Sequence, residues 1–327
     1  MSKHTDRRNF LKKSLMVSAG AAGAVTTAGS FEEADLLAQQ ADKEITGASK
    51  KAINWTSLKE LKGKVPTGKI GNLTISKMIL GGNLIGGWAH ARDLIYVSKL
   101  VRAYHTDEKV WETYALAEEC GINTHLTNPK LFKVITDYWK QGGTLQFISD
   151  CGGDDIMVGI KTSIDAGACS CYLHGGIADG LVERGEWDTI EKALELIRSN
   201  GIPAGIGGHY LKTVKKCADR GIVPDYWMKT FHETNYWSAQ HPTEKDNIYC
   251  RTPQDTIDFM AKREEPWIAF KTMAAGAIHP KQAFPFAFEN GADFICVGMY
   301  DFQLVEDVNL TLDILNGPLN RKRPWRA

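Results

Sequence analysis

The sequence predicts an eight-stranded parallel barrel surrounded by helices, the (β/α)8 or TIM-barrel fold of the α/β class. Short apolar runs recur eight times between residues 78 and 298, and amphipathic stretches of helical period separate them. Alternation of this kind is the signature of βα units that pack as a parallel sheet. Eight units within about 230 residues match the size of a closed barrel.

The expected strands are rich in apolar residues and four to six residues long. They are Met78–Asn83, Asn123–Leu126, Leu145–Ser149, Ser170–His174, Ala204–Gly207, Tyr226–Thr230, Trp267–Lys271 and Phe294–Gly298. The clearest helical stretches are Glu108–Cys120, Trp187–Ser199 and Gln254–Arg263. Glycines that stop a helix before the next strand are expected at Gly121, Gly142, Gly201, Gly221 and Gly291.

A doubly wound open sheet is the rival architecture. It would normally have fewer units and a GxGxxG turn after its first strand, where a dinucleotide binds. The glycines of residues 81–87 follow the first expected strand but do not fit that spacing. The closed barrel is therefore the preferred prediction.

The first residues indicate a leader for export. Paired arginines, Arg7 and Arg8, are followed by Phe10-Leu11-Lys12 and then by a weakly apolar, Ala/Gly-rich run from Ser14 to Ser30, the arrangement of a twin-arginine signal. The run is too short and too weakly apolar for a membrane span. We expect cleavage between Ala28 and Ala41, a bacterial periplasmic or otherwise extracytoplasmic location, and the twin-arginine export machinery as a partner.

The expected domain boundaries follow from that leader. Residues 1–40 contain the signal and the start of a linker, residues 41–67 are polar and continue the linker, and residues 68–327 form the barrel. No stable membrane span is expected after processing.

Charge and cysteine content narrow the class of partner. Acidic and basic residues balance at 39 each, without long runs of either sign, so nucleic acid is not an expected partner and a small molecule is. The seven cysteines are scattered, with no CxxC pair, which favours free buried thiols.

Several segments resemble the aldo-keto reductase superfamily. Gly71–Asn83 is similar to that family's opening hairpin and first strand, and Ala117–Thr124 to the end of its first helix and its second strand. Tyr172–Gly175 resembles the fourth strand with its catalytic histidine, and Ala193–His209 the helix and strand that follow. The resemblance implies a (β/α)8 barrel, hydride transfer with NAD(P), and a role for His174.

The rest of the family's catalytic tetrad is missing. Where the family has Asp and Tyr this chain has Leu126 and Leu131, and where it has Lys this chain has Asp150 and Cys151. Leucine cannot donate a proton to a carbonyl, so the usual reduction lacks its acid. Val297–Glu306 resembles the cofactor segment, but without basic residues for a 2′-phosphate.

Polar side chains gather at the expected strand ends, where barrel enzymes hold their active sites. The candidate catalytic residues are Asp150, His174, His209, Lys229 and Lys271. The candidate substrate-binding residues are Asn83, His125, Asn128, Glu233, Tyr236, Trp237 and Asp301. One hypothesis is a divalent metal (Zn, Mn or Fe) held by some of His125, Asp150, His174, His209 and His232. The alternative is that these histidines only bind substrate or neighbouring loops.

Lys229 and Lys271 recur in similar contexts on adjacent strands. A lysine in an apolar strand needs a partner or a wet cavity, and burial lowers its pKa. Such a lysine can act as a base or form a Schiff base, whereas the structural alternative is an ion pair with Asp150, Glu233 or Asp301. The long loop from His232 to Asn247 carries Tyr236 and Trp237, which suit either a sugar ring or a packing interface.

These observations favour an exported barrel enzyme that acts on a small sugar-like or carbonyl substrate. Proton-transfer, lyase or hydrolytic chemistry is expected at the His/Lys/Asp site. Two alternatives stay open: an atypical NAD(P)-dependent oxidoreductase, and a catalytically inactive barrel that binds a sugar.

Overall fold

The computed structural model describes residues 56–90, 94–243, 245, 247 and 249–327. The predicted signal, with most of the linker, lies outside these residues. Residues Leu61–Ala327 form one compact unit, while the described part of the preceding unit contains a short 3-10 helix, η1 (Leu58–Glu60). No helix within the described ranges is long and apolar enough to cross a membrane.

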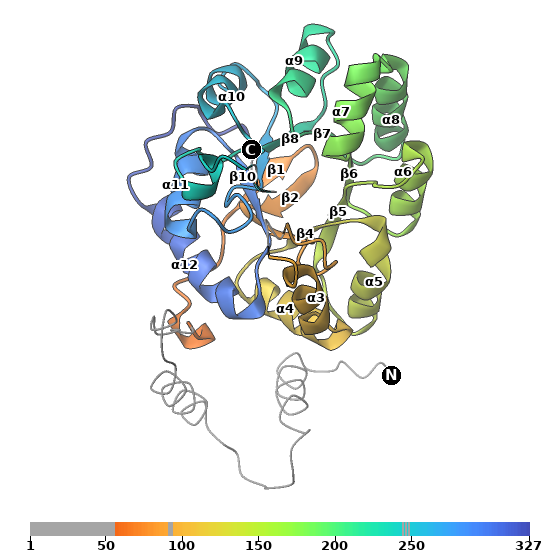
Figure 1. The fold of residues 1–327 in the computed structure, drawn as a ribbon. Coiled ribbons are helices and arrows are strands. Elements are labelled where there is room, and N and C mark those ends of the chain that lie inside the picture. The colour runs from red at the N-terminus through yellow and green to blue at the C-terminus, as the bar shows by residue number, and fades with distance from the viewer. Residues whose placement is uncertain (1–55, 91–93, 244, 246, 248) are drawn as a thin grey trace, which may run out of the picture. The chain divides into compact units, whose positions relative to one another are not determined.

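Eight parallel strands close into a barrel, as predicted, with helices around them (Figure 1). The strands are β3 (Met78–Gly81), β4 (Thr124–Thr127), β5 (Gln146–Ser149), β6 (Ser170–Leu173), β7 (Ala204–Gly208), β8 (Tyr226–Thr230), β9 (Trp267–Phe270) and β10 (Phe294–Val297). They follow one another around the barrel in chain order, and β10 closes it by pairing with β3, with Ile295 opposite Met78. All eight predicted strands are confirmed, most of them a residue or two shorter than expected.

The helices that connect the strands form the outer layer. They are α3 (Val97–Tyr104), α4 (Asp107–Glu119), α5 (Phe132–Lys140), α6 (Ile156–Asp165), α7 (Gly175–Arg184), α8 (Trp187–Ser199), α9 (Leu211–Asp219), α10 (Pro253–Met260), α11 (Pro280–Glu289) and α12 (Asp301–Asn316), with short 3-10 turns η2 (Pro129–Leu131) and η3 (Trp237–Ala239). The predicted glycine stops are confirmed, because all five have positive φ, for example 86° at Gly121 and 109° at Gly291. Only glycine adopts this backbone without steric cost.

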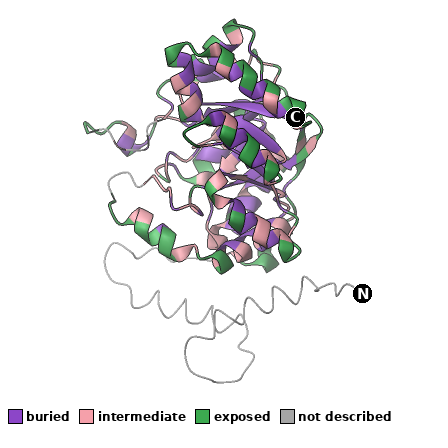
Figure 2. Ribbon diagram, turned by 90° about the vertical axis from the view of Figure 1, so that its right-hand side faces the viewer, coloured by how far each residue is buried: buried purple, intermediate pink, exposed green. Residues whose placement is uncertain are grey.

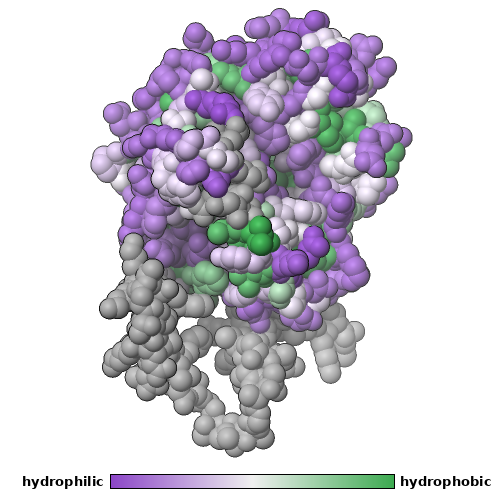
Figure 3. All heavy atoms as spheres, in the orientation of Figure 1, coloured by the Kyte–Doolittle hydropathy of each residue, from purple (hydrophilic) through white to green (hydrophobic). Residues whose placement is uncertain are grey.

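Alternation along the strands decides which side chains fill the barrel. Ile79, Ile148, Tyr172, Met228 and Phe294 belong to one buried cluster inside it. The intervening residues face the helices, so each strand is buried on both sides, as parallel barrels require. Figure 2 shows the resulting pattern, with buried strands and helices exposed on their outer side. The face seen in Figure 3 is mostly hydrophilic, with hydrophobic residues in small patches.

The amino-terminal end of the barrel is closed by two segments. The hairpin of β1 (Thr67–Ile70) and β2 (Leu73–Ser76) adds Ile70 and Ile75 to the barrel cluster. From the other end of the chain, Arg323 places its guanidinium 2.6 Å from the carboxylate of Asp293, and both side chains are fully buried. Lys77 Nζ donates to the carbonyl oxygen of Ala327 (3.0 Å). The opposite end, where the strands finish, carries the polar residues.

Candidate active site

Two histidines lie side by side at the carboxyl ends of neighbouring strands. His174 follows β6 and His209 follows β7, and their ring centroids are 6.0 Å apart in an edge-to-face arrangement. Gly175 permits this approach, because a Cβ built there would lie 3.0 Å from Cε1 of His209. The structure therefore brings together two of the five candidate catalytic residues predicted from the sequence.

An aspartate on the neighbouring helix holds His209. The Asp179 carboxylate of α7 accepts hydrogen bonds from His209 Nδ1 (3.0 Å) and from the His209 backbone N–H (3.1 Å). Thr213 donates to the other carboxylate oxygen (2.5 Å). Since a carboxylate only accepts, Nδ1 of His209 carries a proton, and in the neutral ring Nε2 presents a lone pair.

His174 has its Nδ1 and Nε2 roles exchanged relative to His209: Nδ1 accepts and Nε2 donates. Its Nδ1 accepts a hydrogen bond from the backbone N–H of Gly176 (3.2 Å), where His174 caps α7. The proton of the neutral ring is therefore on Nε2. Burial, with the nearby charge of Lys271, lowers the pKa of His174 to about 4, so the ring is a neutral donor at pH 7.

Asp150 lies at the end of β5, one strand further around the barrel. Its carboxylate accepts from Asn128 Nδ2 (2.9 Å) and from the backbone N–H of Gly152 (2.8 Å). Burial nevertheless raises the pKa of Asp150 to about 6, with those two hydrogen bonds opposing the shift. Asp150 and Asn128 are thus paired, and the carboxyl can exchange a proton near neutral pH.

Lys229 is a buried cation beneath the mouth. It is 1% exposed, and its Nζ donates to His209 O (2.8 Å), Thr230 O (2.8 Å) and Thr230 Oγ1 (2.6 Å). Burial lowers its pKa to about 8. All three N–H groups are used, so Lys229 is placed to contribute charge and to hold the backbone of His209. This geometry does not favour a Schiff base on Lys229.

Lys271 reaches the same region from the end of β9. Its Nζ lies 2.9 Å from Nε2 of His90 and 3.6 Å from the centroid of the Tyr249 ring, a cation–π contact. Its backbone has φ of 57°, a conformation that costs energy for a residue with a Cβ. Such strain is concentrated at functional sites.

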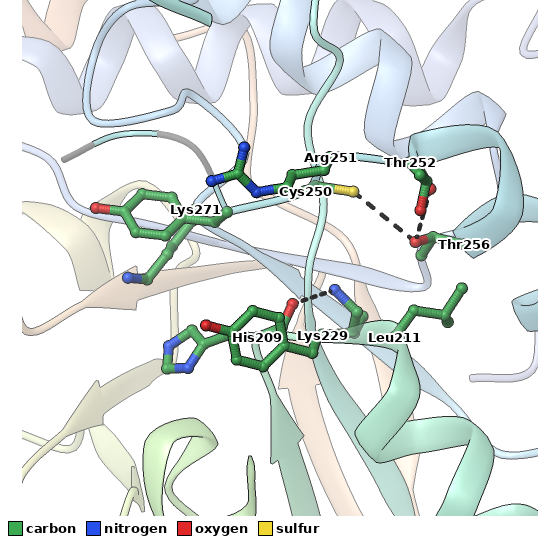
Figure 4. A pocket seen from close by; sticks show the side chains of 10 residues that line it. His209, Leu211, Lys229, Cys250, Arg251, Thr252, Thr256 and Lys271 are labelled. Atoms are coloured by element: carbon green, nitrogen blue, oxygen red, sulfur yellow. Dashed lines mark hydrogen bonds between the residues drawn. The ribbon is translucent and has the colours of Figure 1, made fainter. Parts of the chain in front are cut away.

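A cavity of about 350 Å³ opens next to these residues (Figure 4). It is bounded by the ends of β7, β8 and β9 and by the last part of the β8–α10 loop. The lining residues are His209, Tyr210, Leu211, Lys229, Tyr249, Cys250, Arg251, Thr252, Thr256 and Lys271. The lining contains no residue of the predicted loop, His232 to Asn247, and residues 249–252, which follow that loop, line the cavity instead.

Two of the predicted histidines lie elsewhere. His125 is fully buried, and its Nδ1 lies 3.1 Å from Leu80 O while its ring packs on Tyr114 of α4. It faces the helices because the next residue, Leu126, faces the barrel interior. His232 bonds Glu233 O through Nδ1 (2.7 Å) and accepts from the N–H groups of Tyr249 and Cys250 through Nε2. Both rings are structural.

The other predicted substrate contacts are dispersed. Asn83 is exposed after β3, and Glu233 follows His232 at the end of β8. Tyr236 is buried and donates to Asn247 O (2.9 Å), whereas Trp237 is 58% exposed. Asp301, at the start of α12, pairs with Tyr104 and Lys109.

The residues do not fit a metal centre. No group of three or more His, Cys, Asp or Glu side chains within the described ranges is placed to hold a metal ion. Of the five predicted ligands, His125 and His232 have structural roles, and Asp179 occupies Nδ1 of His209. A structural or catalytic zinc site needs at least three protein ligands around one point.

In the segment that the resemblance implies to bind NAD(P), residues 297–306, the start of α12 is already bonded to side chains of this chain. At the start of α12 the side chain of Gln303 accepts a hydrogen bond from the backbone N–H of Tyr300 (3.2 Å). The Asp301 carboxylate accepts from the hydroxyl of Tyr104 (2.5 Å) and from Lys109 Nζ (3.3 Å). A helix start that is capped by its own side chains and carries a carboxylate does not suit the pyrophosphate of a dinucleotide.

Sequence reasoning missed Asp179 and Arg251. Asp179 lies five residues after His174 in the first turns of α7, where a carboxylate faces the end of the next strand. Its position in the helix after a histidine-terminated strand was the available signal. Arg251 lies at the far end of a long loop, and no local pattern marks it.

Comparisons with known proteins place the fold. No family model matches the chain, and no curated protein matches it either. Among solved structures, a protein described as an aldo-keto reductase from Pseudomonas aeruginosa is 15% identical, with 78% of this chain and 98% of that one covered and a TM-score of 0.53. The likeness is one of fold.

Two further solved structures are similar at lower TM-scores. A glycerol dehydrogenase from Gluconobacter oxydans is 11% identical over 75% of this chain and 89% of that one, with a TM-score of 0.47. A phospho-2-dehydro-3-deoxyheptonate aldolase from Thermotoga maritima is 12% identical over 80% of this chain and 76% of that one, with a TM-score of 0.49. At these identities only the TIM-barrel fold is shown, and the reaction must be argued from the residues of this chain.

Proposed function

We propose that this chain is an exported enzyme that moves a proton at a carbon next to a carbonyl group in a small hydroxylated substrate, as isomerases and lyases do. One observation carries the proposal: His174 and His209 are adjacent but present opposite groups at Nε2, a donor and an acceptor. This pairing supplies both halves of an enolisation.

His209 is the base in this scheme. Its Nε2 lone pair takes the proton from the carbon, and the Asp179 carboxylate at Nδ1 stabilises the imidazolium that forms. Asp179 is held in turn by Thr213 and by the His209 backbone. The ring is therefore oriented before substrate arrives, which lowers the cost of reaching the transition state.

His174 stabilises the developing negative charge. As the C–H bond breaks, its electron pair forms the C=C bond and the carbonyl π electrons move to oxygen, which accepts a hydrogen bond from the Nε2–H of His174. The low pKa of His174 keeps its ring neutral at pH 7. The ring can therefore donate the Nε2–H hydrogen bond to the oxygen as an uncharged group. The proton of the adjacent substrate hydroxyl then moves to the former carbonyl oxygen, so that the hydroxyl-bearing carbon becomes the new carbonyl. The proton on His209 returns to the former carbonyl carbon, which completes an isomerisation.

Lys271 and Asp150 assist from either side of the histidine pair. The ammonium of Lys271 lowers the energy of the enolate by its charge, from a position fixed by Tyr249 and His90. Asp150, whose pKa lies near 6, can relay a proton between substrate hydroxyl and solvent. Both roles support the transfer of a proton at carbon: Lys271 through its charge and Asp150 as a proton relay.

The exchange of carbon-bound hydrogen for deuterium in the substrate tests this function directly. The purified protein is incubated in D₂O with hydroxylated aldehydes, ketones and sugars, and mass spectrometry measures deuterium that remains on carbon. We expect exchange with at least one substrate, and its loss in His209→Gln. Substrate-dependent reduction of NAD(P)⁺ without exchange would instead establish the oxidoreductase alternative. Sugar binding with neither reaction would establish the binding barrel.

A further inference from the structure

The cavity beside His209 is strongly cationic. Among its ten lining residues three carry positive charge, namely Lys229, Arg251 and Lys271, and none carries a carboxylate. The nearest acid identified at the site, Asp179, is already bonded to His209 and Thr213. A concave space with this charge attracts anions and repels cations.

The excess of positive charge at this cavity is most unfavourable for Lys229, because its ammonium is buried. Lys229 is 1% exposed, and all of its hydrogen-bond acceptors are uncharged oxygens. No carboxylate of the described residues forms an ion pair with it. The Asp179 carboxylate acts on Lys229 through its charge but is already bonded to His209 and Thr213, so an anion in the adjoining cavity would add negative charge that a buried ammonium needs.

Two helices also begin at this cavity. Tyr210 and Leu211 lead into α9, and Thr252 precedes α10, and neither helix has a side-chain hydrogen bond at its N-cap. Their first-turn amides and helix dipoles add positive potential on the same side as the lysines. Asp255, in the first turn of α10, opposes part of this effect but is exposed.

From these features we propose that the cavity binds a phosphate group of the substrate, so that the enzyme acts on a phosphorylated hydroxy-carbonyl compound. Lys271, Arg251 and the Thr252 hydroxyl are placed to contact the phosphate oxygens, while Lys229 supplies charge from behind. Three cations suit a dianion better than a single carboxylate. A volume of about 350 Å³ leaves room for a short carbon chain that extends toward His209.

This inference deepens the proposed function by naming its substrate class, but it can be tested without turnover. Inorganic phosphate, acetate and glucose are titrated separately into the full protein by calorimetry. We expect saturable phosphate binding, acetate binding weaker by about tenfold or more, and no heat from glucose. Acetate binding as tight as phosphate, or no saturable phosphate binding, would overturn the proposal.

Matched variants localise the binding. Arg251→Met should weaken phosphate binding by about tenfold, because it removes a charge that lines the cavity. The control is Arg220→Met, which removes the same charge from an exposed residue that stacks on Trp187 outside the cavity. Equal affinities in the two variants would refute the assignment. Lys229→Met should also weaken binding, with circular dichroism and the unfolding midpoint reporting whether its fold is intact.

The two proposals fail separately. His174→Gln, a change outside the cavity lining, should greatly slow deuterium exchange and keep phosphate binding. Phosphate binding without exchange by the wild type for any phosphorylated substrate would reject the proton-transfer function and retain the subsite. Deuterium exchange with neutral substrates, in a protein that does not bind phosphate, would reject the phosphate subsite and retain the proton-transfer function.

Discussion

The Asp179 carboxylate accepts two hydrogen bonds from His209, one from the ring Nδ1 and one from the backbone N–H. Ring and backbone are thereby fixed by one side chain of α7. The same helix begins with His174, whose own Nδ1 accepts from Gly176. Residues 176 and 179 of α7 thus decide which ring nitrogen carries the proton in each histidine. As a result, Nε2 of His174 is a donor and Nε2 of the neutral His209 ring is an acceptor.

Asp179→Asn should slow deuterium exchange by about 10²- to 10⁴-fold, the usual contribution of a positioned acid or base. An amide can donate as well as accept, so it neither fixes the proton on Nδ1 nor stabilises the imidazolium. Glu183→Gln, an exposed change on the same helix, is the control and should leave the rate unchanged. A wild-type rate in Asp179→Asn would remove His209 from the role of base.

Replacing His174 and His209 together by alanine should abolish activity and leave folding intact. Groups at the mouth of a barrel serve function more than stability. Deuterium exchange and the midpoint of urea unfolding measure the two properties in the same preparations. Full activity in the double variant would show that the site lies elsewhere.

Lys271 offers a test of backbone strain. Its φ of 57° is costly for alanine as for lysine, whereas glycine adopts it freely. We expect Lys271→Gly to be more stable than Lys271→Ala by about 1 kcal/mol, with both variants losing activity. Urea denaturation gives the free energies of unfolding. A Gly variant less stable than the Ala variant would mean that this backbone conformation is not retained in solution.

Asp307 should make stability depend on pH. It is 4% exposed in α12, its Oδ2 has no hydrogen-bond partner, and burial, with the charge of Glu306, raises its pKa from 3.8 to about 7. Between pH 4 and 7 the folded state holds a proton that the unfolded state has lost. The free energy of unfolding therefore falls as pH rises through this window.

Asp307→Asn does not titrate and isolates that contribution. Relative to the wild type, the variant should gain about 3 kcal/mol of stability between pH 4 and pH 8. Urea denaturation of both proteins at the two pH values gives this difference. A constant difference would show that Asp307 ionises normally in the folded protein.

Arg323→Met should cost up to about 3–5 kcal/mol, because it removes the nearer guanidinium of the buried Asp293 carboxylate (2.6 Å) and leaves only that of Arg321 at 3.6 Å. Asp293 also accepts from the N–H of Trp267 (2.9 Å), so neutralising it keeps a hydrogen bond. The double variant Arg323→Met with Asp293→Asn should recover part of the loss. If the double variant is as unstable as the sum of the two single variants, the charge pair is not the cause.

Much of the barrel could be predicted from the sequence because strand and helix periods are local. The runs at 78–83 and 226–230, for example, became β3 and β8 with little change in their bounds. Positive φ at Gly121 and Gly291 likewise follows from a local rule on helix ends.

The site was less predictable, because strand ends do not reveal which way a side chain points. His125 has the same sequence character as His174, yet strand alternation turns it toward Tyr114 and away from the barrel interior. His232 is used to hold residues 249 and 250 of its own loop. Asp179 acts across two elements, and only the packed structure brings it to His209.

The closure of the barrel by Arg323 and Ala327 has a consequence for biosynthesis. Asp293 and Lys77 lie beside strands at opposite ends of the barrel sequence, and both depend on residues 321–327 for a partner. While that stretch is still inside the ribosome, the nascent chain cannot satisfy either charge. This end of the barrel therefore closes only after residues 321–327 have emerged from the ribosome, which ties the last contacts of the fold to the last stretch of the barrel sequence to be made.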